Sequence, residues 1–160
     1  MKTATKPDNS ESEKSLEATA LLRADHKVVD ALFTEFEAAK TSAEKKQIVA
    51  KICAELTVHA QVEEEIFYPA FKKTLKDKEL VPEAIVEHAT LKGLIAQVEN
   101  IEPDGEMYDA KVMVLIEYVK HHVKEEEDEM FPKAKSSDMD LNKLGTQMAE
   151  RKAELMAETA

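Results

Sequence analysis

Histidine and glutamate recur at the same spacing in two parts of this sequence. His59 and Glu63 are four residues apart, and so are His122 and Glu126. On a helix, residues four apart lie on one face, one turn from each other, so both side chains of a pair can reach one metal cluster. Imidazole and carboxylate donors together favour Fe, Mn or Zn over Mg or Ca, which prefer oxygen ligands alone. The two pairs therefore predict a transition-metal site.

The two pairs belong to a longer internal repeat, in which residues 25–69 align with residues 87–132. Asp25-His26 matches Glu87-His88, and both repeats end in an aromatic residue followed by proline. This self-similarity predicts two helical hairpins of one design, related by a pseudo-twofold axis. Four imidazoles and two bridging carboxylates would supply eight donor atoms to two metal ions and leave positions for an outside ligand. The predicted metal ligands are His26, His59, Glu63, His88, His122 and Glu126.

Five segments have the three- and four-residue apolar spacing of amphipathic helices. Short connections between the first four predict an antiparallel up-down-up-down four-helix bundle, in which each helix carries one histidine on its inward face. Thr41 and Glu44 resemble a capping box before the second helix, and Pro69 should end or bend that helix near its last turn. The expected helices cover residues 16–40, 42–71, 82–100 and 106–130, followed by a shorter C-terminal helix that Ser136, Ser137 or Asp138 caps and that ends near residue 157.

Composition agrees with an all-α fold and restricts the function. Glycine and proline are scarce, with 3 and 5 residues in 160, so helix breakers are rare. A net charge of −11 argues against nucleic acid or an anionic membrane surface as a partner. Cys53 is the only cysteine, which excludes an intramolecular disulfide and is compatible with a reducing cytoplasm. The expected organisation is a flexible polar tail (1–14) without a signal peptide, a bundle (15–135), and a C-terminal helix and tail (136–160).

Two further residues of the fourth helix lie near the predicted ligands by their phase. Tyr118 precedes His122 by one turn, so its phenol is a candidate catalytic group that donates a hydrogen bond to a bound ligand or fills a metal position. Simple packing of the ring is the alternative. Glu129 lies seven residues after His122 and should point partly inward. The rest of the acidic runs is interpreted as a solvated helix face, which consists of Glu64, Glu65, Glu125, Glu127 and Asp128.

The repeated histidine and His-x3-Glu pattern resembles that of the hemerythrin-like, or HHE cation-binding, family of the bacterial type, across roughly residues 16–135. The resemblance implies an antiparallel four-helix bundle that holds two non-haem iron ions joined by an oxo or hydroxo bridge. It also implies that the four histidines are terminal iron ligands and that Glu63 and Glu126 bridge the irons.

The sequence departs from the animal oxygen carriers of that family at two points. The carriers have a second histidine on the third helix, where this chain has Ala84 and Lys92 at the flanking positions. They also separate the fourth-helix histidine from its acid by one residue more, a spacing that His121 and Glu126 satisfy, whereas the internal register favours His122. With one imidazole fewer, reactive chemistry at an open iron is favoured over reversible oxygen carriage.

The leading hypothesis is a non-haem di-iron protein that binds and reacts with O2, H2O2 or NO in oxidative or nitrosative stress defence. Its activity would be peroxide consumption of the catalase type or reduction of NO or O2, with an electron-donor protein as partner and a monomer or weak oligomer as the working form. The alternative is an oxygen or iron sensing or storage protein without turnover. A ferritin-type oxidase is disfavoured, because it needs Glu-x-x-His pairs and the sequence has none.

Overall fold

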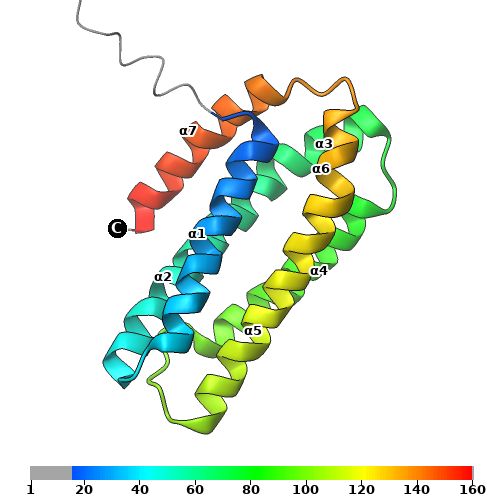
Figure 1. Ribbon diagram of the computed structural model, residues 1–160. Helices are drawn as coiled ribbons and strands as arrows, with labels where there is room; N and C mark the ends of the chain where they lie inside the picture. Colours follow the sequence, from blue (N-terminus) through cyan, green and yellow to red (C-terminus); the bar gives the residue numbers. More distant parts are fainter. Residues whose placement is uncertain (1–15, 160) are drawn as a thin grey trace, which may run out of the picture.

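The computed structural model describes residues 16–159, and within them the chain is helical with no strand (Figure 1). The all-α prediction is confirmed. The expected polar tail, residues 1–14, lies outside the described residues. The elements are α1 (Ala18–Ala38), α2 (Ser42–Val62), η1 (Glu63–Phe67), α3 (Tyr68–Leu75), α4 (Leu80–Val98), α5 (Glu106–Glu125), η2 (Glu126–Met130), α6 (Phe131–Lys135) and α7 (Leu141–Thr159), where η denotes a π-helical segment.

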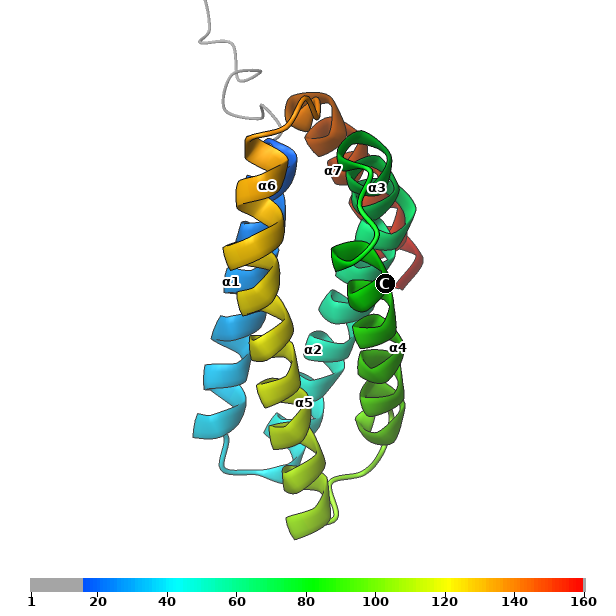
Figure 2. The same cartoon turned by 90° about the vertical axis from the view of Figure 1, so that its right-hand side faces the viewer.

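Four antiparallel helical rods form the bundle (Figure 2). The first hairpin pairs α1 with the rod α2–η1–α3, and the second pairs α4 with the rod α5–η2–α6. The additional helix α7 packs against α1, α2 and η1, on the outer side of the first hairpin. Gly145 permits this close approach, because a Cβ at that position would lie 2.1 Å from the carbonyl oxygen of Leu16. No helix within residues 16–159 has a stretch long and apolar enough to cross a bilayer.

Side-chain caps define where the helices begin. Thr41 caps α2 as predicted, because its Oγ1 accepts a hydrogen bond from the Glu44 N–H at 3.2 Å. α7 begins later than predicted, and the expected caps at 136–138 were wrong. Asp140 Oδ1 accepts from the Lys143 N–H at 3.1 Å, whereas Ser137 Oγ donates to the carbonyl of Ala134. Ser137 therefore stabilises the turn before the helix.

Both hairpins contain a π-helical segment at the same place in the repeat. η1 and η2 begin at Glu63 and Glu126 and end two residues before Pro69 and Pro132. Proline lacks an N–H and its ring collides with the carbonyl four residues earlier, which ends most helices. Here the extra residue of the π turn places each proline in the first turn of a new α-helix, where a missing N–H costs little. The predicted helix end near residue 71 was therefore wrong, and α3 continues to Leu75.

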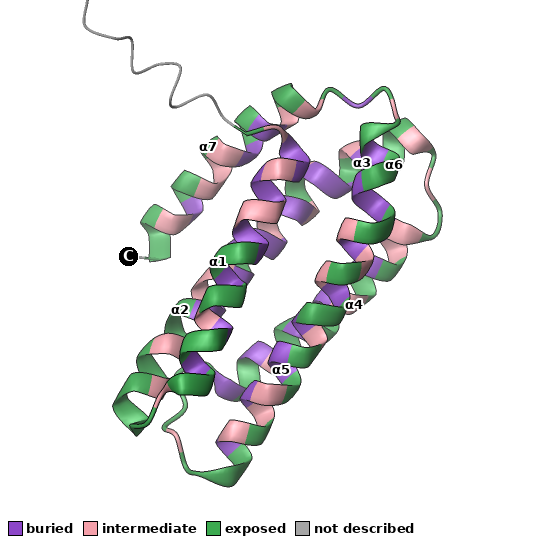
Figure 3. Cartoon of the chain, in the orientation of Figure 1, coloured by how far each residue is buried: buried purple, intermediate pink, exposed green. Residues whose placement is uncertain are grey.

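The apolar core is divided into two clusters, which lie toward opposite ends of the bundle. The buried faces of the helices point at one another along its length (Figure 3). One cluster gathers around Phe67, Phe71 and Phe131, and the other around Phe33 and Tyr108. Along each of the four rods, one histidine falls between residues of the two clusters. A polar layer thus interrupts the core at the position of the predicted ligands.

Candidate metal centre

The structure brings the six predicted ligands together in this polar layer. All six are buried, and no exposed fraction among them exceeds 8%. One histidine comes from each of α1, α2, α4 and α5, while Glu63 and Glu126 are the first residues of η1 and η2. Their donor atoms form two groups in which all atoms lie within 4.8 Å of one another. The groups are His26, His59 and Glu126, and Glu63, His88 and His122.

Each glutamate reaches imidazoles of both groups. Glu63 Oε1 lies 3.1 Å from Nε2 of His59 and 3.3 Å from Nε2 of His88. Glu126 places one carboxylate oxygen 3.3 Å from Nε2 of His26 and the other 3.4 Å from Nε2 of His122. A carboxylate with imidazoles on both sides stands where it can bridge two cations.

Several of the inward-facing atoms make no hydrogen bond in spite of their proximity. They are Nε2 of His26 and His59, both carboxylate oxygens of Glu63, and Oε1 of Glu126. Buried polar atoms without a partner cost free energy, and buried carboxylates cost most when no cation balances them. A pair of bound cations would satisfy all of these atoms at once. The donor set, four imidazoles with two carboxylates, fits transition metals of the Fe, Mn and Zn class.

The opposite nitrogen of each imidazole faces an acidic side chain. These four acids are termed here the outer carboxylates. Three of them bind Nδ1 through a hydrogen bond, which leaves Nε2 directed inward and orients the ring as a ligand, whereas Nδ1 of His88 has no hydrogen bond. The contacts from Nδ1 are His26 to Glu127 at 2.9 Å, His59 to Asp25 at 2.9 Å, His88 to Glu64 at 3.4 Å, and His122 to Glu87 at 3.1 Å.

The outer carboxylates correct part of the sequence interpretation. Glu64 and Glu127 were assigned to a solvated face, but both are half-buried and face histidines of the other hairpin. Asp25 and Glu87 precede equivalent histidines and face a histidine of their own hairpin. The signal for all four was the repeat itself, since each acid has a counterpart with the same contact in the other half.

In the absence of a cation, the charges within the cluster strongly shift the pKa values of its members. Burial alone would lower the pKa of His122, but the hydrogen bond to Glu126 and the charges of Glu126 and Glu63 raise it to about 9. His59 behaves in the same way, because Glu63 and Asp25 outweigh its burial and raise its pKa well above the usual value. Burial would raise the pKa of Glu126, but His122 holds it well below the ordinary range. Protonated imidazoles thus balance the carboxylates until a cation displaces their protons.

Tyr68 is a member of the site that the sequence prediction missed. Its hydroxyl donates a hydrogen bond to Glu126 Oε2 at 2.8 Å and lies 3.1 Å from Nε2 of His88. Burial and the negative charges of Glu126 and Glu63 raise the pKa of this phenol well above its ordinary value, so it keeps its proton. The equivalent residue of the other repeat, Phe131, instead stacks on His26 at 5.9 Å between ring centroids.

Two residues considered near the site lie outside the cluster. Tyr118 is half-buried, and within the described residues no hydrogen bond joins it to the six ligands, although it lines a cavity together with His88 and His122, so its predicted role toward a bound ligand stays a prediction. The side chain of His121 is 66% exposed and pairs with Glu125 at 3.1 Å. The structure therefore places His122 and not His121 among the donors.

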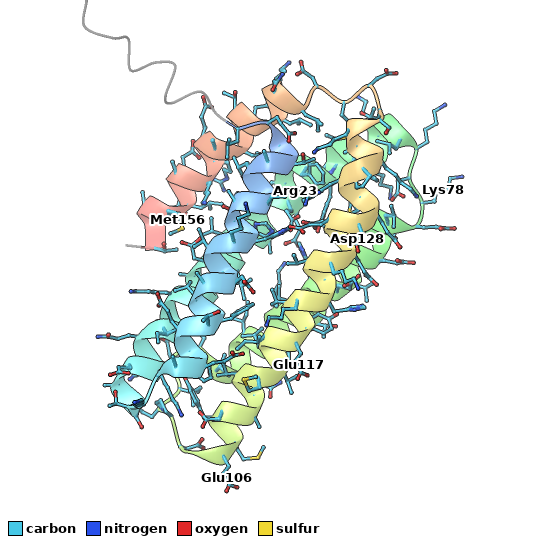
Figure 4. The ribbon with its side chains drawn as sticks, viewed as in Figure 1. Arg23, Lys78, Glu106, Glu117, Asp128 and Met156 are labelled. Carbon is cyan, nitrogen blue, oxygen red and sulfur yellow. The ribbon has the colours of Figure 1, made fainter. Side chains whose placement is uncertain are left out.

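A cavity of about 440 Å³ opens between α1 and α5 and reaches the histidines. Arg23 and Asp128, labelled in Figure 4, lie on opposite sides of this gap. The walls are mainly apolar, while the rim carries charges of both signs. Apolar residues of the wall include Val29, Phe33, Leu56 and Leu91, and basic residues of the rim are Arg23, Lys27, Lys120 and Lys124. We call this space the wide cavity.

Comparison with known proteins agrees with this arrangement. A DNA nickase of Nostoc sp. strain PCC 7120 is 30% identical over 111 residues, which cover 69% of this chain and 31% of that protein, so the chain spans about a third of the relative's length. The crystal structure of a hemerythrin HHE cation binding domain-containing protein from Mycobacterium kansasii has the same fold, with a TM-score of 0.78 over 89% of each chain at 23% identity. The family model described as hemerythrin HHE cation binding domain matches residues 17–134, which include all six predicted ligands. The chain therefore belongs to the hemerythrin HHE cation-binding domain family.

Proposed function

We propose that this protein is a non-haem di-iron protein that binds and reacts with O2, H2O2 or NO, in defence against oxidative or nitrosative stress. The observation that carries the proposal is the pair of buried carboxylates, Glu63 and Glu126, three of whose four oxygens lack hydrogen-bond partners among four inward-facing imidazoles. The wide cavity supports it, because a small oxidant can reach the histidines from solvent. The working form is proposed to be a monomer or weak oligomer that receives electrons from a donor protein.

In this function, bound iron would supply the electrons that the oxidant accepts. The residues of the chain orient the ligands, hold a proton and limit the access of water. Glu127, Asp25 and Glu87 accept the Nδ1 protons of His26, His59 and His122 and so keep Nε2 free as the ligand atom, while Glu64 lies near Nδ1 of His88 without a hydrogen bond. Tyr68 holds a proton on its hydroxyl beside Glu126, within reach of an oxidant at the Glu63–His88–His122 group. Val29, Phe33 and Leu91 limit the water in the wide cavity.

A matched pair of histidine variants tests this proposal. The wild type, His88→Ala and His121→Ala would be loaded with ferrous iron without oxygen, and then exposed to O2 or H2O2. The wild type and His121→Ala should retain two irons per chain and consume the oxidant, while His88→Ala should lose iron and activity. The ultraviolet–visible spectrum, iron content and oxidant consumption are the measurements. Full iron binding by His88→Ala, or no reaction of the iron-loaded wild type, would refute the proposal.

A second candidate function is sensing or storage of iron or oxygen without turnover. The observation that favours it is a contact between α7 and the site, in which Lys152 Nζ lies 2.5 Å from Asp25 Oδ1 and Asp25 contacts His59. A change of metal occupancy at His59 could thus alter the docking of α7. Limited proteolysis within α7, with and without iron, separates the two functions, because the sensing function requires protection that depends on iron and no consumption of oxidant.

A further inference from the structure

A second and much narrower opening reaches the cluster between α4 and the rod α5–η2. Its volume is about 20 Å³, room for about one water molecule. It ends at His122 and Glu126. Four glutamates surround it, and no lysine or arginine is among its lining residues, in contrast to the wide cavity. We call it the acidic opening, formed by Glu83, Glu87, Glu125 and Glu129.

A buried carboxylate with one unpartnered oxygen stands at the inner end of the acidic opening. Glu126 is 1% exposed, lines the opening, and its Oε1 makes no hydrogen bond. A buried carboxylate oxygen without a partner costs free energy, which a bound cation would recover. The path therefore runs from exposed carboxylates at Glu83 and Glu129 to the buried Glu126.

The same place in the first hairpin is apolar and covered by α7, and the hollow of about 430 Å³ between α1 and α7 there is lined by none of the six predicted ligands. In the repeat, Glu83, Glu125 and Glu129 correspond to Leu21, Val62 and Ile66.

α7 covers that apolar face, where Leu21, Val62 and Ile66 belong to one core cluster with Met148 and Leu155 of α7. The position equivalent to Glu87 is Asp25, which Lys152 of α7 neutralises. Of the two pseudo-equivalent routes, one is sealed by apolar packing, while the other is open and ringed by acids.

We propose that divalent cations, ferrous iron above all, reach the cluster through the acidic opening, and that the wide cavity admits the oxidant. The inference rests on cation binding by the six ligands, which is part of the proposed function, and not on the reaction with an oxidant. Clustered carboxylates raise the local concentration of cations and speed their association, most strongly at low salt. The wide cavity has no such surplus of negative charge, because four basic side chains among its lining residues balance four acidic ones (Asp25, Asp30, Glu127 and Asp128).

Kinetics of Co2+ loading test the route without any need for catalytic activity. The test variant is Glu83→Gln/Glu125→Gln/Glu129→Gln, which leaves out Glu87 because it orients His122. The matched control is Glu99→Gln/Glu106→Gln/Glu117→Gln, which removes the same charge from α5 and from the residue that caps the end of α4, outside the opening. Glu106 lies at the far end of α5 (Figure 4). Each metal-free protein is mixed with Co2+ in a stopped-flow spectrometer, and bound cobalt is measured at the end.

The test variant should load at least about fivefold more slowly than the wild type and the control at low salt. All three should reach the same final cobalt content, and added salt should slow the wild type more than the test variant. Equal loading rates of the test variant and the control would overturn the acidic opening as a route, while cation binding would stand. No cobalt binding by the wild type would overturn both this inference and the proposed function.

Discussion

The two helical hairpins share one ligand pattern but differ in what surrounds it. Both supply two histidines, one buried glutamate and a π turn that begins at that glutamate. The first hairpin is covered by α7, whereas the second faces solvent with the acidic opening. Tyr68 and Phe131, equivalent in the repeat, make the aromatic surroundings of the two histidine pairs differ as well. In the proposed function, the two cations take equivalent ligand groups, while cation entry and proton supply are needed on one side only.

Removal of either bridging glutamate should have the largest effect, and the same effect in both halves. Glu63→Ala and Glu126→Ala should each bind at most one cation per chain, because both metal groups lose a shared ligand. Without metal, each should also unfold more easily by about 3–5 kcal/mol, since buried protonated imidazoles lose their counter-charge. Metal analysis and urea unfolding measure both, with Glu129→Ala as the control that keeps two cations. Two cations in either variant would show that the glutamates do not bridge.

The stability of the metal-free protein should fall as the pH rises. The pKa of His122 is raised to about 9 in the folded chain, from 6.5 in the unfolded chain. Its stabilising contribution is therefore complete below pH 6.5 and is lost as the pH rises through 9. The loss amounts to up to about 3 kcal/mol, and His59 adds to it in the same direction. Urea unfolding at several pH values measures it, and a metal-free protein with equal stability at pH 6.5 and 9 would contradict it.

Replacement of Tyr68 by phenylalanine should give both histidine pairs the same aromatic neighbour, because the equivalent residue of the other repeat is Phe131. Tyr68→Phe should destabilise the metal-free protein by about 2 kcal/mol, because a hydrogen bond to the charged Glu126 is lost. It should also slow oxidant consumption by the iron-loaded protein, since the proton on the hydroxyl is gone. Tyr118→Phe is the matched control and should change neither quantity. A larger effect of the Tyr118 variant would support the role predicted for that residue.

Removal of the contact between Lys152 of α7 and Asp25 should have the smallest effect on stability. Lys152→Met removes the cation beside Asp25, whose pKa is lowered because hydrogen bonds from His59 and Lys152 outweigh its burial. The expected destabilisation is about 1 kcal/mol, reduced from a buried ion pair because Lys152 is partly exposed. Arg151→Met, which removes a contact with the exposed Glu65, serves as the comparison and should cost less. Thermal unfolding distinguishes the two variants, and an equal or larger loss from Arg151→Met would contradict the assigned link to His59.

Much of the ligand layer could be predicted, because the spacing of residues along a helix determines which side chains point to the same side. Residues four apart on a helix share a face, so His59 with Glu63 and His122 with Glu126 were recognisable as pairs. Tyr68 was not recognisable, because it lies five residues after Glu63 and an α-helix would turn it well away from that face. The π turn of η1, closed by the bond from the Tyr68 N–H to the Glu63 carbonyl, brings it back.

The sequence by itself determined the all-α class, the two hairpins and the candidate donor atoms, because these depend on local periodicity and on an internal repeat. Only the tertiary structure decided which acids face which imidazoles, since Glu64 and Glu127 reach histidines of the other hairpin. It also decided that α7 seals the first hairpin and leaves the second open. Such contacts depend on how rods distant in the chain pack side by side, and no spacing along one helix encodes them.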